Sequence, residues 1–222
     1  MPRSLELGNQ RGTALLLAIT LVLILAAVGA AVSIASRTDI LIAASFRQSR
    51  DALYAAEGAV AHAVHDLTGI PDWDAVLSGA VASSFTDGIA LGVRTLPGGD
   101  TVTLCCGLPS LTHEVQQRAN GGRSWVDDTP QWQIFAWGPA TDWLPGRIDS
   151  VTYVVVWVAD DPDDGDGNPS ADANGIIGLY AQALGPRGGR RVVDVLLRRE
   201  PATEEGLVPP GLRILSWRHS RW

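Results

Sequence analysis

Carboxylate side chains are concentrated in one stretch of this chain, between residues 160 and 174. The stretch holds six aspartates and two asparagines: Asp160, Asp161, Asp163, Asp164, Asp166, Asn168, Asp172 and Asn174. So many carboxylates in one connection repel one another unless water or a cation neutralises them. Calcium takes six to eight hard oxygen ligands and tolerates irregular loops. The residues predicted to bind it are Asp160, Asp161, Asp163, Asp164, Asp166 and Asn168.

The spacing of these residues departs from the EF-hand calcium loop. Asp164, Asp166 and Asn168 alternate as the first ligands of such a loop do. Pro169 then stands in place of the central glycine, and Gly175 in place of the bidentate glutamate. Two interpretations stay open, a looser calcium loop and a solvated acidic turn rich in Asx and glycine.

Two cysteines, Cys105 and Cys106, are adjacent in the sequence. A disulfide between neighbouring residues closes a strained ring. We therefore expect two small residues in a strand or loop, with a vicinal or intersubunit disulfide as the alternative. A zinc site needs more ligands than this pair offers.

Histidines could supply general bases or metal ligands, but their spacing does not favour either. His62 and His65 lie three residues apart on a predicted helix beside Asp66, where surface or interface positions are the ordinary case. His113 lacks the second histidine of a metalloprotease helix. No phosphate-binding loop or nucleophile elbow is present in the sequence, so we expect a protein that is not an enzyme.

An uncharged apolar segment near the N-terminus dominates the sequence. Residues 12–36 carry no charge, and as a helix they extend roughly 37 Å, enough to cross a bilayer core of about 30 Å. Cleaved secretory signals have shorter apolar cores, so a membrane span is predicted. Arg3 and Arg11 precede the segment, whereas Arg37 is followed by Asp39, which favours a cytoplasmic N-terminus and an exported C-terminal part.

The helical pattern continues beyond this span to about Gly69. Apolar residues recur there at steps of three and four, which is typical of an amphipathic helix that packs on a partner surface. The residues predicted to pack are Leu53, Val60, Val64 and Leu67. The simplest interpretation is one continuous helix, apolar all round in its first half and amphipathic in its second.

The N-terminal pattern resembles a known family. The sequence NQRGTALL at residues 9–16, the long apolar helix and AAEGAV at residues 55–60 are similar to PilX-type minor pilins of type IV pili and to GspK-type pseudopilins of type II secretion. The resemblance covers about a quarter of the chain. It implies a leader cut by a prepilin peptidase between Gly12 and Thr13, often followed by methylation of the new N-terminus. Most pilins carry glutamate at the fifth mature position, where this chain has Leu17, which points to a minor or tip component.

Downstream of residue 70 the sequence is typical of strands and turns. Two short segments flank Pro97-Gly98-Gly99-Asp100 as a hairpin would, and residues 132–137, 150–158, 176–184 and 191–198 are predicted strands. The tail at 212–222 could add another. We expect an α+β fold in which the long helix packs on an antiparallel sheet in two layers, as the pilin resemblance also implies. The predicted segments are a leader at 1–12, a transmembrane half-helix at 13–36, an amphipathic half at 37–69 and an exported β-rich domain at 70–222.

The net charge of −7 argues against nucleic acid as the partner, since nucleic-acid binding relies on clustered basic residues. Two functions are considered. The first is a minor pilin or pseudopilin that assembles with other such subunits, from the bacterial inner membrane with its domain in the periplasm, into a surface filament. The second is a membrane-anchored extracytoplasmic adhesion module whose acidic loop binds calcium.

Overall fold

The computed structural model describes residues 10–121, 129–142, 151–200 and 211–221 of the 222-residue chain. The chain divides into two compact units after Arg47. In the first unit, the described residues belong to helix α1 (Gln10–Gly69). The C-terminal part of the same helix, from Gln48, belongs to the second unit with the sheet. Residues 1–9 of the predicted leader lie outside the described residues, and so do Ser150 and Trp222, which end two of the predicted strands.

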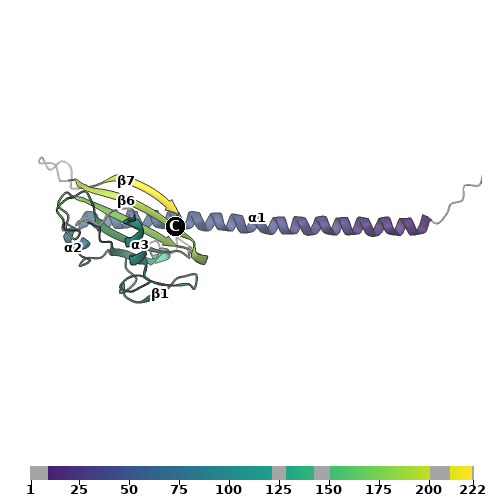
Figure 1. Cartoon of the computed structure of the whole chain (residues 1–222), viewed down its shortest axis with the longest axis horizontal. Coiled ribbons are helices and arrows are strands. Elements are labelled where there is room, and N and C mark those ends of the chain that lie inside the picture. Colours follow the sequence, from purple (N-terminus) through teal and green to yellow (C-terminus); the bar gives the residue numbers. More distant parts are fainter. Residues whose placement is uncertain (1–9, 122–128, 143–150, 201–210, 222) are drawn as a thin grey trace, which may run out of the picture. The chain divides into compact units, whose positions relative to one another are not determined.

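The second unit is built on a five-stranded antiparallel sheet in the order β3-β4-β5-β6-β7, an uninterrupted meander (Figure 1). Its strands are β3 (Gln133–Pro139), β4 (Tyr153–Asp160), β5 (Ile176–Leu184), β6 (Arg190–Glu200) and β7 (Gly211–Arg221). A separate hairpin consists of β1 (Val93–Thr95) and β2 (Thr101–Thr103), and the short helices are α2 (Asp74–Leu77) and α3 (Leu111–Ala119). The fold is therefore α+β with a long N-terminal helix and an antiparallel sheet, as predicted.

One face of the sheet packs on the C-terminal part of α1. Val60 and Leu67 are buried there, and Leu53 and Val64 are partly buried against the same core. Small residues that were not among the four predicted packing residues are buried on the same helix. These alanines are Ala52, Ala55, Ala56, Ala59 and Ala63, and all are buried. Small side chains at three- and four-residue steps let the helix lie close to the sheet.

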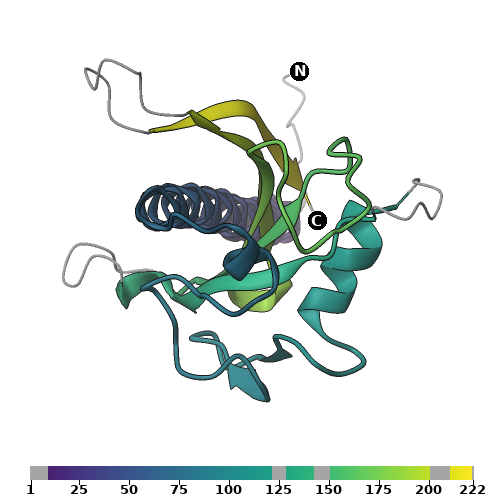
Figure 2. The same cartoon turned by 90° about the vertical axis from the view of Figure 1, so that its left-hand side faces the viewer.

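The expected two-layer arrangement is wrong, because the sheet is covered on both faces. Figure 2 shows the C-terminal part of α1 on one side of the sheet and α3 on the other. A second core forms under α3 around Trp157, Tyr153 and Leu111. Every residue of β4 and β5 is buried. A continuous apolar strand such as Tyr153–Ala159 requires this, because its alternate residues would otherwise face water.

Helix α3 was not predicted from the sequence, although a local signal marks its start. Ser110 caps the helix, since its side chain accepts a hydrogen bond from the His113 amide at 3.3 Å. Leu111 and Val115, four residues apart, are its buried side chains. The indole of Trp157 donates to the Thr112 hydroxyl at 2.9 Å and so joins α3 to β4.

Candidate functional site

The acidic loop connects the two central strands, β4 and β5, and begins at the last residue of β4. Asp160, Asp164 and Asp166 each offer a carboxylate oxygen, and these three oxygens lie within 4.8 Å of one another. Asp160 is only 3% exposed, Asp164 is half-buried and Asp166 is exposed. The end of a buried strand thus carries one carboxylate into the protein, and the loop brings two more to it.

The loop backbone is organised by its own polar side chains. Oδ1 of Asp161 accepts a hydrogen bond from the Asp163 amide at 2.9 Å. Oδ1 of Asp166 accepts one from the Asn168 amide at 2.7 Å, and Oδ1 of Asn168 accepts one from the Ser170 amide at 3.3 Å. These side-chain contacts two residues along the chain are Asx turns, which fix a loop without secondary structure.

Asp172 closes the loop. Its Oδ1 accepts hydrogen bonds from the amides of Gly175, at 2.7 Å, and Ile176, at 3.1 Å. Burial raises the pKa of Asp172, the two amides oppose that rise, and the nearby charge of Asp164 adds to it. The Asp172 amide in turn donates to Oδ1 of Asp74 at 2.9 Å, which ties the loop to α2.

Three of the six predicted calcium ligands are brought together, namely Asp160, Asp164 and Asp166. Asp161 and the exposed Asp163 lie outside this cluster, and Oδ1 of Asn168 accepts a hydrogen bond from the Ser170 amide. The donor set is all oxygen, which suits a hard cation such as calcium better than zinc. Three carboxylates supply at most six oxygens, so such a cation would also need loop carbonyls or water.

A cleft of about 240 Å³ lies beside the acidic loop, on the α3 side of the sheet. Its lining residues include Trp132, Asp160, Asp161, Asp163, Asp194 and Arg218. The sequence does not connect Trp132 and Asp194 with the loop, because they come from other segments of the chain. Only the strand order β3-β4-β5-β6-β7 brings them together.

A second polar cluster joins α1 to the segment that follows α2. Oδ2 of Asp66 accepts hydrogen bonds from the Ser83 hydroxyl at 2.5 Å and the Ser84 amide at 2.7 Å. Nε2 of His62 lies 3.1 Å from the Ser84 hydroxyl and 3.7 Å from Oδ2 of Asp66. A serine–histidine–aspartate relay needs the hydroxyl and the carboxylate on opposite ring nitrogens. Here the Ser84 hydroxyl and the Asp66 carboxylate both approach Nε2, so the cluster lacks the geometry of such a relay. Its hydrogen bonds instead fasten the segment after α2 to α1.

The electrostatics of Asp66 agree with this structural role. Burial by itself would raise the pKa of Asp66, but hydrogen bonds from Ser83 and Ser84 outweigh it. With the nearby His62, they hold the pKa below the usual 3.8. The carboxylate is therefore held in its charged form by the segment it anchors.

The adjacent cysteines, Cys105 and Cys106, form a vicinal disulfide, so the expectation of two reduced small residues is wrong. Cys106 has a φ of 64°, in the left-handed region that few non-glycine residues adopt. Joined in this way, the sulfurs offer no thiolate to a metal.

The predicted processing site lies at the start of the described helix. Gly12 and Thr13 are both exposed, and a Cβ atom added at Gly12 would meet no described atom within 4 Å beyond the adjacent helix backbone. The helix that follows is long and apolar enough to cross a membrane, and none of its most apolar window is buried within the chain.

No match to this chain is found among protein-family models, curated proteins or solved structures. A proposal for the function of this chain therefore rests on its own residues and contacts.

Two features of the described residues bear on function. One is the exposed apolar helix that begins near Gly12, and the other is the acidic loop with its adjoining cleft. The exposed apolar helix must be covered by lipid or protein. The carboxylates of the acidic loop must be solvated by water or neutralised by a cation.

Proposed function

We propose that this chain is a minor pilin or pseudopilin, a subunit that joins or primes a type IV pilus-like filament through its N-terminal helix. The observation that carries the proposal is the double character of α1. Its most apolar window is wholly exposed, whereas Ala56, Val60 and Leu67 near its other end are at most 1% exposed. One continuous helix thus packs on the sheet through its C-terminal part and leaves the apolar surface of its N-terminal part uncovered.

The uncovered surface is too apolar to remain in water. Large hydrophobic residues that are about half or more exposed include Leu15, Leu16, Leu17, Leu21, Val22, Leu23, Ile24, Leu25, Val28, Val32 and Ile34. Each such side chain gains roughly 1.5–3 kcal/mol when it leaves water. A bilayer can cover this surface before assembly, and apolar helices of neighbouring subunits can cover it in a filament. This exchange of lipid for protein is the physical basis of the proposed assembly.

Processing and topology belong to the same proposal. The basic residues Arg3 and Arg11 precede the span and favour a cytoplasmic N-terminus, with the sheet domain in the periplasm. A prepilin peptidase would cut between Gly12 and Thr13 on the cytoplasmic side. With Leu17 in place of the glutamate that most pilins carry, the subunit needs no partner ahead of it, which suits a tip or priming position.

Substitution of Gly12 tests this proposal directly. Gly12→Asp should block cleavage while membrane insertion and domain folding persist, because Gly12 is exposed and a Cβ atom there has room. Gly8→Asp is the matched control, with the same chemical change inside the leader, and should be processed. Intact-protein mass spectrometry measures both, in cells that express a prepilin peptidase. A wild-type protein that keeps Met1 in its mature pool would overturn the proposal.

A second candidate function is favoured by the carboxylate cluster of Asp160, Asp164 and Asp166. In this alternative, the uncut helix anchors an extracytoplasmic adhesion module, and calcium orders its acidic loop. The same mass measurement separates the two functions, since an anchor keeps its leader and a pilin loses it.

A further inference from the structure

The two edges of the five-stranded sheet differ in whether another segment covers them. The β3 edge is covered by the segment at residues 83–87. The Ser83 amide donates to the Phe135 carbonyl at 2.8 Å. The Trp137 amide donates to the Phe85 carbonyl at 3.2 Å, and the Asp87 amide donates to the Trp137 carbonyl at 2.8 Å. This edge is closed to further pairing.

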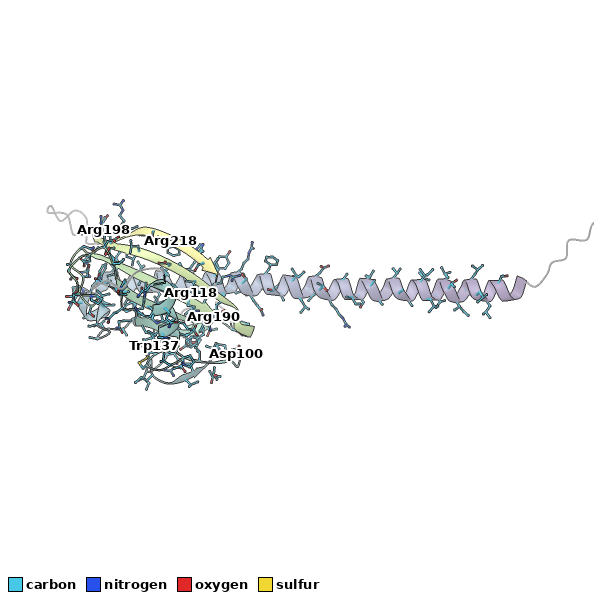
Figure 3. All side chains as sticks on the ribbon, viewed as in Figure 1. Asp100, Arg118, Trp137, Arg190, Arg198 and Arg218 are labelled. Carbon is cyan, nitrogen blue, oxygen red and sulfur yellow. A yellow bond between two sulfur atoms is a disulfide. The ribbon has the colours of Figure 1, made fainter. Side chains whose placement is uncertain are left out.

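The β7 edge is open within the described part of the chain. Strand β7 pairs with β6 from Gly211 to Arg221, and no described segment hydrogen-bonds to its other side. Eleven residues is about twice the usual strand length. Exposed amides and carbonyls along such an edge are a template for another strand. In Figure 3, Arg218 lies over the β6–β7 part of the sheet, away from Trp137 on the covered β3 edge.

A bulge divides this edge and defines the part that can pair regularly. The register between β6 and β7 shifts at Leu196 and Leu197, which leaves Leu215 as the extra residue. Bulges interrupt pairing and are one way to blunt an edge. From Ser216 to Arg221 the register is unbroken. This regular stretch is the available docking strand.

The two faces of the docking strand have different chemistry. Trp217 lies opposite Val195, which belongs to the core under α1. His219 lies on the same face, and its Nε2 is 3.0 Å from Glu57 Oε1 on α1. Trp217 is still 38% exposed, and Ile214, which precedes the bulge and lies on the same face of β7, is 48% exposed. An added strand with apolar residues on this face would cover both.

The other face of β7 carries two arginines, and one of them, Arg218, lines the cleft together with aspartates of the acidic loop. Arg218 lies opposite Asp194 of β6, and Arg213 precedes the bulge. Arg213 has an ion pair with Glu200 at 3.5 Å, but its side chain is 66% exposed. Strand β7 contains no acidic residue. Two β7 strands from two copies would therefore bring only positive charges into one seam, which disfavours self-pairing.

We propose that β7 accepts an extended, acidic segment of a partner protein as a sixth strand of the sheet. Backbone hydrogen bonds along Ser216–Arg221 supply affinity, and carboxylates beside Arg213 and Arg218 select the partner. Apolar residues at alternate positions contact Trp217 and Ile214. This mode is β-strand addition, in which the backbone binds and alternate side chains discriminate. It concerns the sheet domain and stands whether or not the chain is a filament subunit.

The test uses the full chain in detergent micelles and a fluorescent eleven-residue peptide with glutamate at alternate positions and valine or threonine between them. Fluorescence anisotropy should show saturable binding, and the same peptide with lysine for glutamate should bind about tenfold more weakly or worse. A version methylated on alternate backbone nitrogens should also lose binding, because it cannot donate to the β7 carbonyls.

Matched charge reversals locate the site. Arg213→Glu with Arg218→Glu should weaken binding about tenfold, whereas Arg37→Glu with Arg50→Glu, an equal charge change at exposed helix positions, should have little effect. If the double substitution in β7 unfolds the domain, hydrogen exchange of the wild-type protein with and without the peptide locates the binding site. Bound peptide should slow exchange of amides in 216–221 and leave 133–139 unchanged.

Three results would overturn the proposal. They are equal binding of the acidic and basic peptides, protection outside β7, and preferential binding of a single-stranded oligonucleotide over the acidic peptide. The last result would mean that Trp217 stacks on bases and Arg218 contacts phosphate instead.

Discussion

The guanidinium carbon of Arg199 lies 4.1 Å from the ring centroid of Trp73. The same side chain donates hydrogen bonds to the carbonyls of Pro71, at 2.6 Å, and Ile70, at 3.2 Å. These carbonyls belong to the two residues that directly follow α1. One arginine from β6 therefore holds the helix end and the following turn on the sheet.

Arg199→Ala should lower the free energy of unfolding by roughly 1–3 kcal/mol, because the cation–π contact and two charge-assisted hydrogen bonds are lost together. Arg199→Lys should recover only part of this, since an ammonium lacks the planar fork that reaches both carbonyls. Urea unfolding of the full chain in detergent measures the difference. Arg198→Ala, at the neighbouring exposed position, is the control, and an equal loss there would remove the special role of Arg199.

Val60→Asp should destabilise the domain by roughly 3–5 kcal/mol, because Val60 is fully buried among apolar residues that cannot pair with a carboxylate. Ala61→Asp makes a comparable change at the next residue, which is exposed, and should cost far less. Thermal melts of both variants beside the wild type make the comparison. Similar melting temperatures would mean that α1 does not pack on the sheet in solution.

Calcium should raise the melting temperature of the full chain if Asp160, Asp164 and Asp166 bind it in the folded state. Extracellular sites bind at about 10⁻⁴–10⁻³ M, so millimolar calcium is the relevant range. Magnesium should do less, because it dehydrates reluctantly and requires octahedral geometry.

Asp164→Asn with Asp166→Asn should abolish the calcium response of the melt. The matched control replaces two exposed aspartates elsewhere, Asp51→Asn with Asp100→Asn, and should keep it. A wild-type melt that is indifferent to calcium, magnesium and chelator would leave the loop as a solvated turn.

Asp66 should make stability depend on pH in the acid range. Its folded pKa lies below the usual value of 3.8, so the folded state binds the proton less tightly than the unfolded state. The stabilisation is therefore fully present above about pH 4 and is lost as pH falls through the folded pKa. Asp66→Ala should cost roughly 1–3 kcal/mol at neutral pH, and the difference from wild type should shrink below about pH 4.

Unfolding experiments at pH 7, 5, 4 and 3 would measure this dependence. Asp51→Ala, an exposed carboxylate on the same helix, should change stability little at any of these values. A constant difference between Asp66→Ala and the wild type across the range would contradict the assigned cause.

The sequence by itself determined the elements with strong local patterns. The uncharged run after Gly12 predicts a helix long enough to span a membrane, and such a helix is present. Turn residues around Gly98 and Gly99 predict the hairpin of β1 and β2. The apolar runs that became β4, β5 and β6 were predicted with bounds close to those observed. Periodicity and turn chemistry act between near neighbours, so one sequence is enough to read them.

Tertiary structure alone decided which of these elements and side chains meet. The continuous apolar run of β4 required cover on both faces, but only the fold shows that α3 supplies the second cover. Six aspartates in one loop look alike in sequence, yet the strand end at Asp160 selects which carboxylates approach it. Asp66 and Ser83 are 17 residues apart, and only folding forms their contact.

The same distinction holds for the edges of the sheet. The sequence 212–222 suggested a further strand, but nothing local marks it as the open edge. That property depends on the strand order and on the segment near Phe85 that covers β3 instead of β7. Contacts between distant residues follow from packing the whole chain, because loop closure and burial are shared among all elements and are not encoded in any one of them.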